Sequence, residues 1–305
     1  MRINAKSGKS IFVILVMVGS LPTWGQNFDK EEIHTTPLRD NLYLLTGIGG
    51  NIVISTGADG TLIVDDEYPE LNGKLMVAIG KVTDRPVRFA INTHWHSDHT
   101  GGNEMLGNSG AIIIAHEGTG KRMTTDSVMS LYGPQAAYAP AGHAKITFSE
   151  SMQLHHNGET IDLVHPGPSH TDGDTVVFFR EHNVLMTGDI FVGFDYRPPY
   201  FDDLNGGSLA GTIAGAQAIL NLINDKTVVV PGHGELATRT DVVAYHARLI
   251  ELRDRIQAAI ARGDSEDAVV ASKPVSDFAR TGKGTDRWVR VVYREYKRTR
   301  PGKRE

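Results

Sequence analysis

Short apolar runs and glycine-rich turns alternate in the first part of the chain. Residues 41–67 contain three such runs, which predict an antiparallel meander, and a polar lead-in over residues 26–40 precedes them. Beyond the meander, helix-type and strand-type patterns alternate. They predict a helix over 70–82, a strand over 87–92, a short helix over 101–106 and a strand over 111–115.

A second β-rich region follows at residues 145–186, where short strand-like runs are separated by turn residues. The runs are ITF, SMQLHH, ETIDLV, DTVVFFR and NVLM, and we expect them to form a second sheet. Helical periodicity returns over 208–223 and 239–262, on either side of a strand predicted over 227–234. Two β-rich regions, each followed by helices, predict an α/β fold in which two stacked sheets carry their helices on the outside.

Two segments without a regular pattern are long for connections within a compact domain. They cover residues 127–144 and 191–207, and loops of this length more often cover a functional site than merely join elements. The second loop is rich in aromatic residues, which either line an apolar substrate pocket or pack the loop itself. These residues are Phe194, Tyr196, Tyr200 and Phe201.

Composition limits the classes of function. With 305 residues, 40% of them hydrophobic, the chain is long enough for one large catalytic domain. Its formal net charge of -5 gives no general attraction to nucleic acid or to an anionic membrane, so we expect a small-molecule substrate and no nucleic-acid partner. There is no cysteine, which excludes disulfides and leaves histidine and carboxylates to build any metal site.

The N-terminus has the pattern of an export signal. Positively charged residues precede an apolar stretch at residues 11–18, as in a signal peptide covering residues 1–25. The apolar stretch is too short to span a bilayer comfortably. We therefore expect a periplasmic protein that has no stable membrane anchor after the signal peptide is cleaved.

The mature chain is expected to consist of a catalytic domain over residues 26–262 and a C-terminal helical extension over residues 263–305. Apolar side chains recur every four residues in the extension, at Trp288, Val292 and Tyr296. Such spacing is typical of an amphipathic helix that packs one face on a domain and leaves the other in water. We therefore expect the extension to pack on the catalytic domain.

The residues best suited to chemistry are concentrated in one short stretch, NTHWHSDHTGG, which places three of the 13 histidines within six consecutive positions. The stretch follows a predicted strand directly, so its side chains project from a strand end into a rigid turn. Imidazole nitrogen and carboxylate oxygen are common zinc ligands, and an HxHxDH pattern rarely arises by chance. The candidate ligands are His94, His96, Asp98 and His99.

Further ligands are needed, because a catalytic zinc keeps one position for water and each ion takes about three protein ligands. His170, Asp189 and His233 each stand where an apolar strand meets a glycine-containing turn. Taken singly, each is a common turn residue. Together with the histidine-rich stretch, they are expected to form one set of metal ligands at an edge of the stacked sheets.

These motifs, in this order, resemble those of the metallo-β-lactamase superfamily, and the resemblance covers residues 42–235. It implies an αββα sandwich of two stacked mixed sheets, with helices on the outer faces. It also implies a binuclear, usually zinc, site at the sheet edges.

The resemblance further implies a role for each matched residue. Asp189 would bridge two metal ions, and Asp65, after the run LIV, would be a carboxylate behind the ligands that steadies the ligand loop. The first ion would be held by His94, His96 and His170, and the second by Asp98, His99 and His233.

One departure from the most similar lactamases concerns the residues around Asp189. Those enzymes have a cysteine near this position and a lysine shortly after it, which binds the substrate carboxylate. Here the chain has no cysteine, and Ile190, Phe191 and Val192 follow Asp189. A bridging aspartate at this position is similar to that of the glyoxalase-II-like, lactonase and phosphodiesterase branches. The departure therefore weakens the assignment of a β-lactam substrate and leaves the assignment of the metal ligands unchanged.

The expected reaction is hydrolysis at two Zn²⁺ ions, with iron or manganese as alternatives. Two cations share a water, lower its pKa to about 7 and polarise the carbonyl that the resulting bridging hydroxide attacks. Asp98 is expected to orient this water and relay its proton. Asn205 either donates a hydrogen bond to the developing oxyanion or forms a simple Asn-Gly turn. The expected substrate is a small cyclic amide or ester, with a β-lactam as the best single guess.

Other functions stay open as alternatives. A lactonase or a glyoxalase-II-like thioesterase of the same fold comes first. An iron oxygenase would normally use one metal and leave His99 and His233 without a role. A non-catalytic metal-binding protein would be expected to have lost one or more ligands. The acidic net charge argues against a nuclease.

Overall fold

The computed structural model describes residues 27–193, 198–277 and 283–298, and those from Glu31 onward belong to one compact unit. The expected signal peptide at residues 1–25 lies outside the described residues, as do Phe194 and Tyr196. Within the described ranges, no helix is both long and apolar enough to cross a membrane.

The first sheet is mixed, with the strand order β1-β2-β3-β4-β5-β6-β9. Its antiparallel half is the meander that the alternating apolar runs predict, consisting of β1 (His34–Arg39), β2 (Leu42–Thr46), β3 (Ile52–Ser55) and β4 (Thr61–Val64). Its parallel half adds β5 (Val87–Ile91), β6 (Ile112–His116) and β9 (Ile146–Phe148).

The second sheet has the order β10-β11-β12-β13-β14 and is also mixed, because only the last pair is parallel. Its strands are β10 (Ser151–His156), β11 (Glu159–Val164), β12 (Val176–Phe179), β13 (Val184–Met186) and β14 (Val228–Val230). Apolar side chains of both sheets form one buried core, in which Val53, Val64 and Ile91 of the first sheet cluster with Leu163 and Phe179 of the second. The stacked sheets of the predicted sandwich are thereby confirmed.

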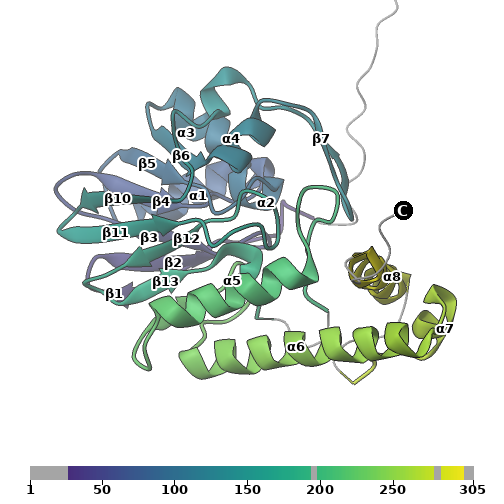
Figure 1. The fold of residues 1–305 in the computed structure, drawn as a ribbon. Coiled ribbons are helices and arrows are strands. Elements are labelled where there is room, and N and C mark those ends of the chain that lie inside the picture. The colour runs from purple at the N-terminus through teal and green to yellow at the C-terminus, as the bar shows by residue number, and fades with distance from the viewer. Residues whose placement is uncertain (1–26, 194–197, 278–282, 299–305) are drawn as a thin grey trace, which may run out of the picture. The chain divides into compact units, whose positions relative to one another are not determined.

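Helices cover the outer faces of the sandwich, as predicted (Figure 1). Four short helices lie on the side of the first sheet, namely α1 (Asn72–Gly80), α2 (Ser97–Thr100), α3 (Asn103–Asn108) and α4 (Glu117–Met123). Two longer helices, α5 (Leu209–Leu222) and α6 (Arg239–Arg262), pack on the second sheet. The bounds of α6 follow from its sequence, because Thr238 and Asp241 cap its start and Gly263, at φ 90°, ends it.

Beyond Gly263 the chain forms two more helices, α7 (Glu266–Ala271) and α8 (Lys283–Arg298). The apolar face of α8 is buried in a cluster with α6 and α7, to which Trp288 and Val292 belong. Tyr293 reinforces the contact, since its hydroxyl donates a hydrogen bond of 2.9 Å to the carbonyl of Asp264. This face follows the four-residue spacing noted in the sequence.

Three details differ from the prediction. The polar lead-in contains strand β1, whose side chains are mostly exposed and therefore show no apolar alternation. The run ITF does not join the second sheet, because β9 pairs in parallel with β6 of the first; a three-residue run carries no signal for its partner. The long loop over 127–144 contains a hairpin of two short strands, β7 (Ser127–Met129) and β8 (Gly133–Gln135).

Candidate metal centre

The histidine-rich stretch begins where β5 ends, and a buried carboxylate fixes its backbone. Asp65 directly follows β4, the strand that pairs in parallel with β5, and its backbone is left-handed at φ 62°. It accepts two hydrogen bonds of 2.8 Å from Thr93, one from the backbone N–H and one from the hydroxyl. The loop that carries His94 and His96 is therefore anchored to the next strand rather than free to move.

Helix α2 turns the second half of the stretch toward the same place. His96 flanks the start of the helix, and the hydroxyl of Thr100 donates to the carbonyl of His96 over 2.9 Å. His99 lies inside the helix, and its Nδ1 is 2.7 Å from Oδ2 of Asp65. Asp65 thus supports the loop and one ligand at once, the position the family resemblance implies for it.

The loop after β11 brings in His170. Its backbone N–H donates over 2.6 Å to Asp174, which also accepts from the N–H and the hydroxyl of Thr171. Asp174 is buried and locks this turn. Sequence reasoning missed Asp174, although it stands in the same motif, PSHTDGD, only four positions after His170.

Two further loops at the same edge carry Asp189 and His233. Asp189 lies in a single turn of 3-10 helix after β13. Gly232, one residue before His233, approaches it so closely that a Cβ on this glycine would collide with Oδ1 of Asp189. The side-chain amide of Asn51 donates to the carbonyls of Pro231 and Gly234, 2.9 Å each. Asn51 therefore holds the His233 loop against the first sheet.

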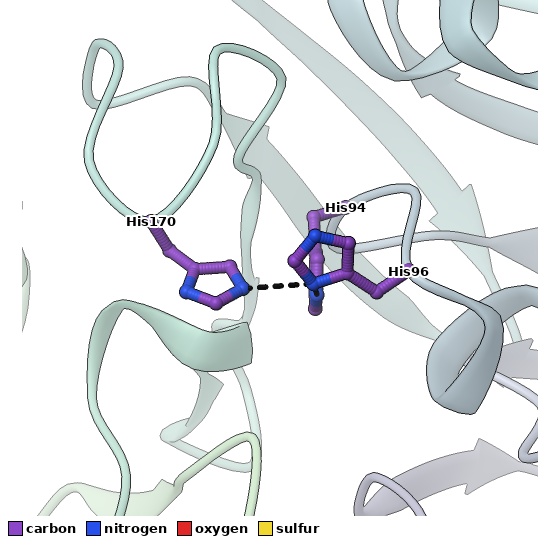
Figure 2. Close-up of side chains that lie close together, drawn as sticks. All are labelled: His94, His96 and His170. Carbon is purple, nitrogen blue, oxygen red and sulfur yellow. Dashed lines mark hydrogen bonds between the residues drawn. The ribbon is translucent and has the colours of Figure 1, made fainter. Parts of the chain in front are cut away.

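The first group of candidate ligands consists of His94, His96 and His170, and Figure 2 shows their rings converging from two facing loops. Nδ1 of His96 lies 3.1 Å from Nε2 of His94 and 3.1 Å from Nε2 of His170. Nitrogens bound tetrahedrally to one zinc at 2.0–2.1 Å are about 3.3 Å apart, so the spacing fits a shared cation.

In His96 and His170, the ring nitrogen that points away from the other histidines, here called the outer nitrogen, indicates what can lie between the rings. Nε2 of His96 is 3.1 Å from Oδ2 of Asp202, and Nδ1 of His170 is 2.9 Å from the carbonyl oxygen of Tyr200. Both partners are acceptors, so each ring carries its proton on the outer nitrogen and turns a lone pair inward. Two lone pairs facing each other at 3.1 Å repel unless a proton or a metal cation lies between them; the dashed contact in Figure 2 is the proton-bridged case. The donor set therefore fits a metal ion.

The second group consists of Asp98, His99 and His233. Nε2 of His233 is 3.2 Å from Nε2 of His99 and 3.2 Å from Oδ2 of Asp98. Asp189 lies between the groups: Oδ2 is 3.6 Å from His170, whereas Oδ1 is 3.3 Å from His99 and 3.5 Å from His233. Each oxygen of Asp189 thus faces a different group.

Burial and charge separate the two groups. Burial lowers the pKa of His94 well below its usual value and that of His170 to about 4, so these rings are neutral, as metal ligands must be. Burial acts in the same direction on His99 and His233, but the neighbouring carboxylates together more than offset it. The charges of Asp189 and Asp98, with hydrogen bonds to these carboxylates, raise the pKa of His99 well above its usual value and that of His233 to about 10. A cation bound beside Asp189 would take the place of these protons.

The side-chain N–H groups of Asn205 have partners within the protein and do not point to an oxyanion. Its side-chain N–H groups donate to the carbonyl of Val128 over 2.8 Å and to Oδ2 of Asp202 over 2.7 Å, and its oxygen accepts from Arg122. Both amide hydrogens are therefore used inside the protein. Asn205 instead supports Asp202, a buried residue that no sequence pattern distinguishes and that orients His96.

Two features beside the centre bear on the substrate. The ring of Tyr200 stacks on His96 at 6.0 Å between centroids, and Tyr132, 60% exposed on the β7–β8 hairpin, meets Tyr200 edge to face at 5.5 Å. The side chains after Asp189 point elsewhere: Ile190 and Phe191 are buried in the apolar cluster under α5 and α6. The side of the centre near the hairpin is therefore aromatic.

Comparison with known proteins gives a family and a fold. The model of the metallo-β-lactamase superfamily matches residues 35–233. A 2,4-dinitroanisole O-demethylase subunit alpha from Nocardioides sp. (strain JS1661) is 26% identical over 258 residues, 82% of this chain and 70% of that protein. A metallo-β-lactamase type 2 from Pseudomonas aeruginosa is 27% identical over 150 residues, 49% of this chain and 53% of that protein. The solved structure of a metallo-β-lactamase from Pontibacter korlensis superposes with a TM-score of 0.60 at 19% identity, covering 72% of this chain and 99% of that one.

Proposed function

The chain belongs to the metallo-β-lactamase superfamily and is a metal-dependent hydrolase, and from this premise we propose that it binds two zinc ions and hydrolyses a small cyclic amide or ester. One observation carries the proposal. The two oxygens of Asp189 face two separate groups of nitrogen and oxygen donors, one made of three histidines and one of Asp98, His99 and His233.

The chemistry follows from the donor set. When bound, two divalent cations would acidify a water molecule and polarise the substrate carbonyl. We assign the binding of that water to Asp98, because its side chain is 21% exposed, more than those of His99, Asp189 and His233, and its Oδ2 lies 3.2 Å from His233. Its carboxylate accepts a hydrogen bond from the water, takes up a proton and delivers it to the leaving nitrogen or oxygen.

A β-lactam is the first substrate class to test. The relative from Pseudomonas aeruginosa, named a metallo-β-lactamase, supports it. The buried Ile190 and Phe191 oppose it, because neither supplies the positive charge that the carboxylate of a β-lactam would need after Asp189. The experiment is a panel of nitrocefin, a lactone and a thioester, assayed with zinc-loaded protein whose metal content is measured.

The expected result of this panel is about two zinc ions per chain and hydrolysis of a cyclic amide or ester. Turnover of the lactone or the thioester without nitrocefin turnover would move the assignment to a lactonase or thioesterase. A single iron per chain, with no hydrolysis of any substrate in the panel, would overturn the proposal in favour of an oxygenase.

A second candidate is hydrolysis of an activated aromatic ether or ester. The stacked pair of Tyr200 and His96, with Tyr132 against it, offers an aromatic surface to a planar substrate. The relative from Nocardioides, whose name gives 2,4-dinitroanisole as its substrate, supports this candidate and matches 82% of this chain.

The variant Tyr200→Ala separates the two candidates, with Tyr200→Phe as the matched control that keeps the ring. The carbonyl of Tyr200 that binds His170 belongs to the backbone, so both variants keep that contact. If the substrate is aromatic, the alanine variant raises KM for 2,4-dinitroanisole about 10-fold and the phenylalanine variant leaves it unchanged. No turnover of 2,4-dinitroanisole by the unmodified protein would eliminate that ether as a substrate.

A further inference from the structure

Helix α8 contacts a short segment of the loop beside the metal centre, residues 199–203, at both of its ends. The indole N–H of Trp288 donates to the carbonyl of Pro199 over 2.8 Å, at the start of the segment. At its end, Arg287 forms an ion pair of 2.8 Å with Asp203. Between these contacts the buried ring of Phe201 packs on Trp288, 6.1 Å between ring centroids.

The segment held in this way reaches two ligands of the first group. The carbonyl of Tyr200 accepts the hydrogen bond from Nδ1 of His170, and Oδ2 of Asp202 faces Nε2 of His96. The backbone N–H of Asp202 also donates to the carbonyl of His170 over 2.7 Å. Residues 199–203 therefore determine which way the lone pairs of two imidazoles point.

Helix α8 is itself held in place by contacts with α5, α6 and α7. Trp288 and Val292 are buried against α6, and Arg290 pairs with Glu266 and Asp267 of α7. Glu295, two turns after Trp288, accepts hydrogen bonds of 3.0 and 2.9 Å from the first two backbone N–H groups of α5. The helix lies beyond residues 35–233, the part of the chain that the family model covers.

We propose that α8 is a positioning element of the metal centre: Trp288 and Arg287 hold residues 199–203 so that this segment orients His96 and His170 toward a shared cation. The inference rests on the proposed metal centre. Outer partners of metal-binding histidines fix the ring orientation, and losing one typically weakens metal binding 10-fold to 100-fold. Arg287 and Trp288 act one contact further out, so the effect lies at the lower end of that range.

The test compares two arginines one turn apart on α8. Arg287 and its partner Asp203 are 37% and 23% exposed, and Arg290 and its partner Glu266 are 36% and 23% exposed. Arg287→Gln and Arg290→Gln thus each remove an ion pair of α8 with the same exposure, and Arg290→Gln also removes the more exposed pair with Asp267. Only the pair of Arg287 touches residues 199–203. Arg287→Lys, which keeps the charge, is the rescue variant, and Trp288→Phe removes the indole donor while keeping an aromatic ring.

Zinc affinity is measured by competition with a chelator. The geometry of the first group is followed by the absorption spectrum of the cobalt-substituted protein. We expect Arg287→Gln and Trp288→Phe to lower the affinity for one of the two metal ions about 10-fold and to change the cobalt spectrum, whereas Arg290→Gln changes neither. Arg287→Lys should recover most of the affinity. Kinetics of any hydrolysed substrate should show the loss in kcat at limiting zinc rather than in KM.

Two results would overturn the inference while leaving the proposed function standing. One is unchanged zinc affinity and cobalt spectrum in Arg287→Gln, and the other is an equal loss in Arg287→Gln and Arg290→Gln, which indicates general loosening of the helix. If the unmodified protein binds no zinc or cobalt, the proposed function fails and the inference fails with it.

Discussion

The ligands that follow the first sheet and those that follow the second are held in place by different means. On the first-sheet side, the ligands from His94 to His99 lie in one six-residue stretch, and one neighbouring residue anchors its backbone. Asp65, at the end of the adjacent strand, binds the backbone and hydroxyl of Thr93 and the ring of His99. Adjacent parallel strands β4 and β5 bring these residues together without any distant element.

On the second-sheet side, three ligands come from three separate loops, and the loops of His170 and His233 have supports of their own. Asp174 locks the His170 loop, Asn51, just before β3 of the first sheet, holds the His233 loop, and residues 199–203, which α8 holds, reach His170. The difference teaches that a ligand stretch at one strand end takes its backbone anchor from the adjacent strand, and only the ring of His96 is oriented from far away, by Asp202. The dispersed ligands depend more on contacts from other parts of the chain.

The largest expected effect comes from exchanging one carboxylate on each side. Asp98→Asn should lower turnover about 10²-fold to 10⁴-fold, because the amide cannot take up the proton that the carboxylate accepts. It should keep the metal held by the first group. Asp189→Asn should weaken binding at both groups, because the two oxygens of Asp189 face one group each. Metal content and turnover of the purified variants check this.

This comparison has a clear point of failure. Turnover of Asp98→Asn near that of the unmodified protein would remove Asp98 from the proton transfer. Loss of only one metal ion in Asp189→Asn would show that Asp189 does not join the two groups.

A smaller effect is expected from the carboxylates that orient the rings. Asp65→Asn replaces the charged acceptor of His99 in the second group with a neutral amide, and Asp202→Asn does the same for His96 in the first. Each should lower zinc affinity about 10-fold to 100-fold, and each at a different ion. Two-step zinc titrations, followed by calorimetry, distinguish the ions. A loss at the same ion in both variants would contradict the separation into two groups.

The smallest effect concerns stability on the first-sheet side. Burial raises the pKa of Glu67 from 4.5 to about 7. Between these values the unfolded chain ionises this carboxyl while the folded protein keeps the proton, so the contribution of Glu67 to stability falls as pH rises and is constant above about 7. Glu67→Gln does not titrate and should therefore gain stability relative to the unmodified protein, by about 3 kcal/mol, between about pH 4 and about pH 8.

Urea unfolding of both proteins at the two pH values measures this difference. A constant difference between Glu67→Gln and the unmodified protein across the range would show that the pKa of Glu67 is not raised in the fold.

The sequence predicts the ligands better than their supports, and the reason is physical. His94, His96, Asp98 and His99 stand in one stretch after a strongly apolar strand, so both their chemistry and their common direction are readable. The ligands His170, Asp189 and His233 follow strands of the second sheet, which short apolar runs also reveal.

The supports leave no such trace. Asp202 orients His96 across 106 positions of the chain, and α8 reaches Pro199 across 89, so only the tertiary structure brings them together. For Asn205 the sequence leaves two interpretations open, an oxyanion donor or a simple Asn-Gly turn, and the structure uses both of its amide hydrogens within the protein. The run ITF predicts a strand but not its partner: it forms β9 of the first sheet rather than a strand of the second, because contacts outside these three residues decide the pairing.

Anomalous diffraction at the zinc edge, from crystals of the zinc-loaded protein, tests the central claim most directly. The account predicts two zinc ions, one bound by His94, His96 and His170 and the other by Asp98, His99 and His233, with Asp189 in contact with both. A single ion, or an ion bound away from these side chains, would contradict it.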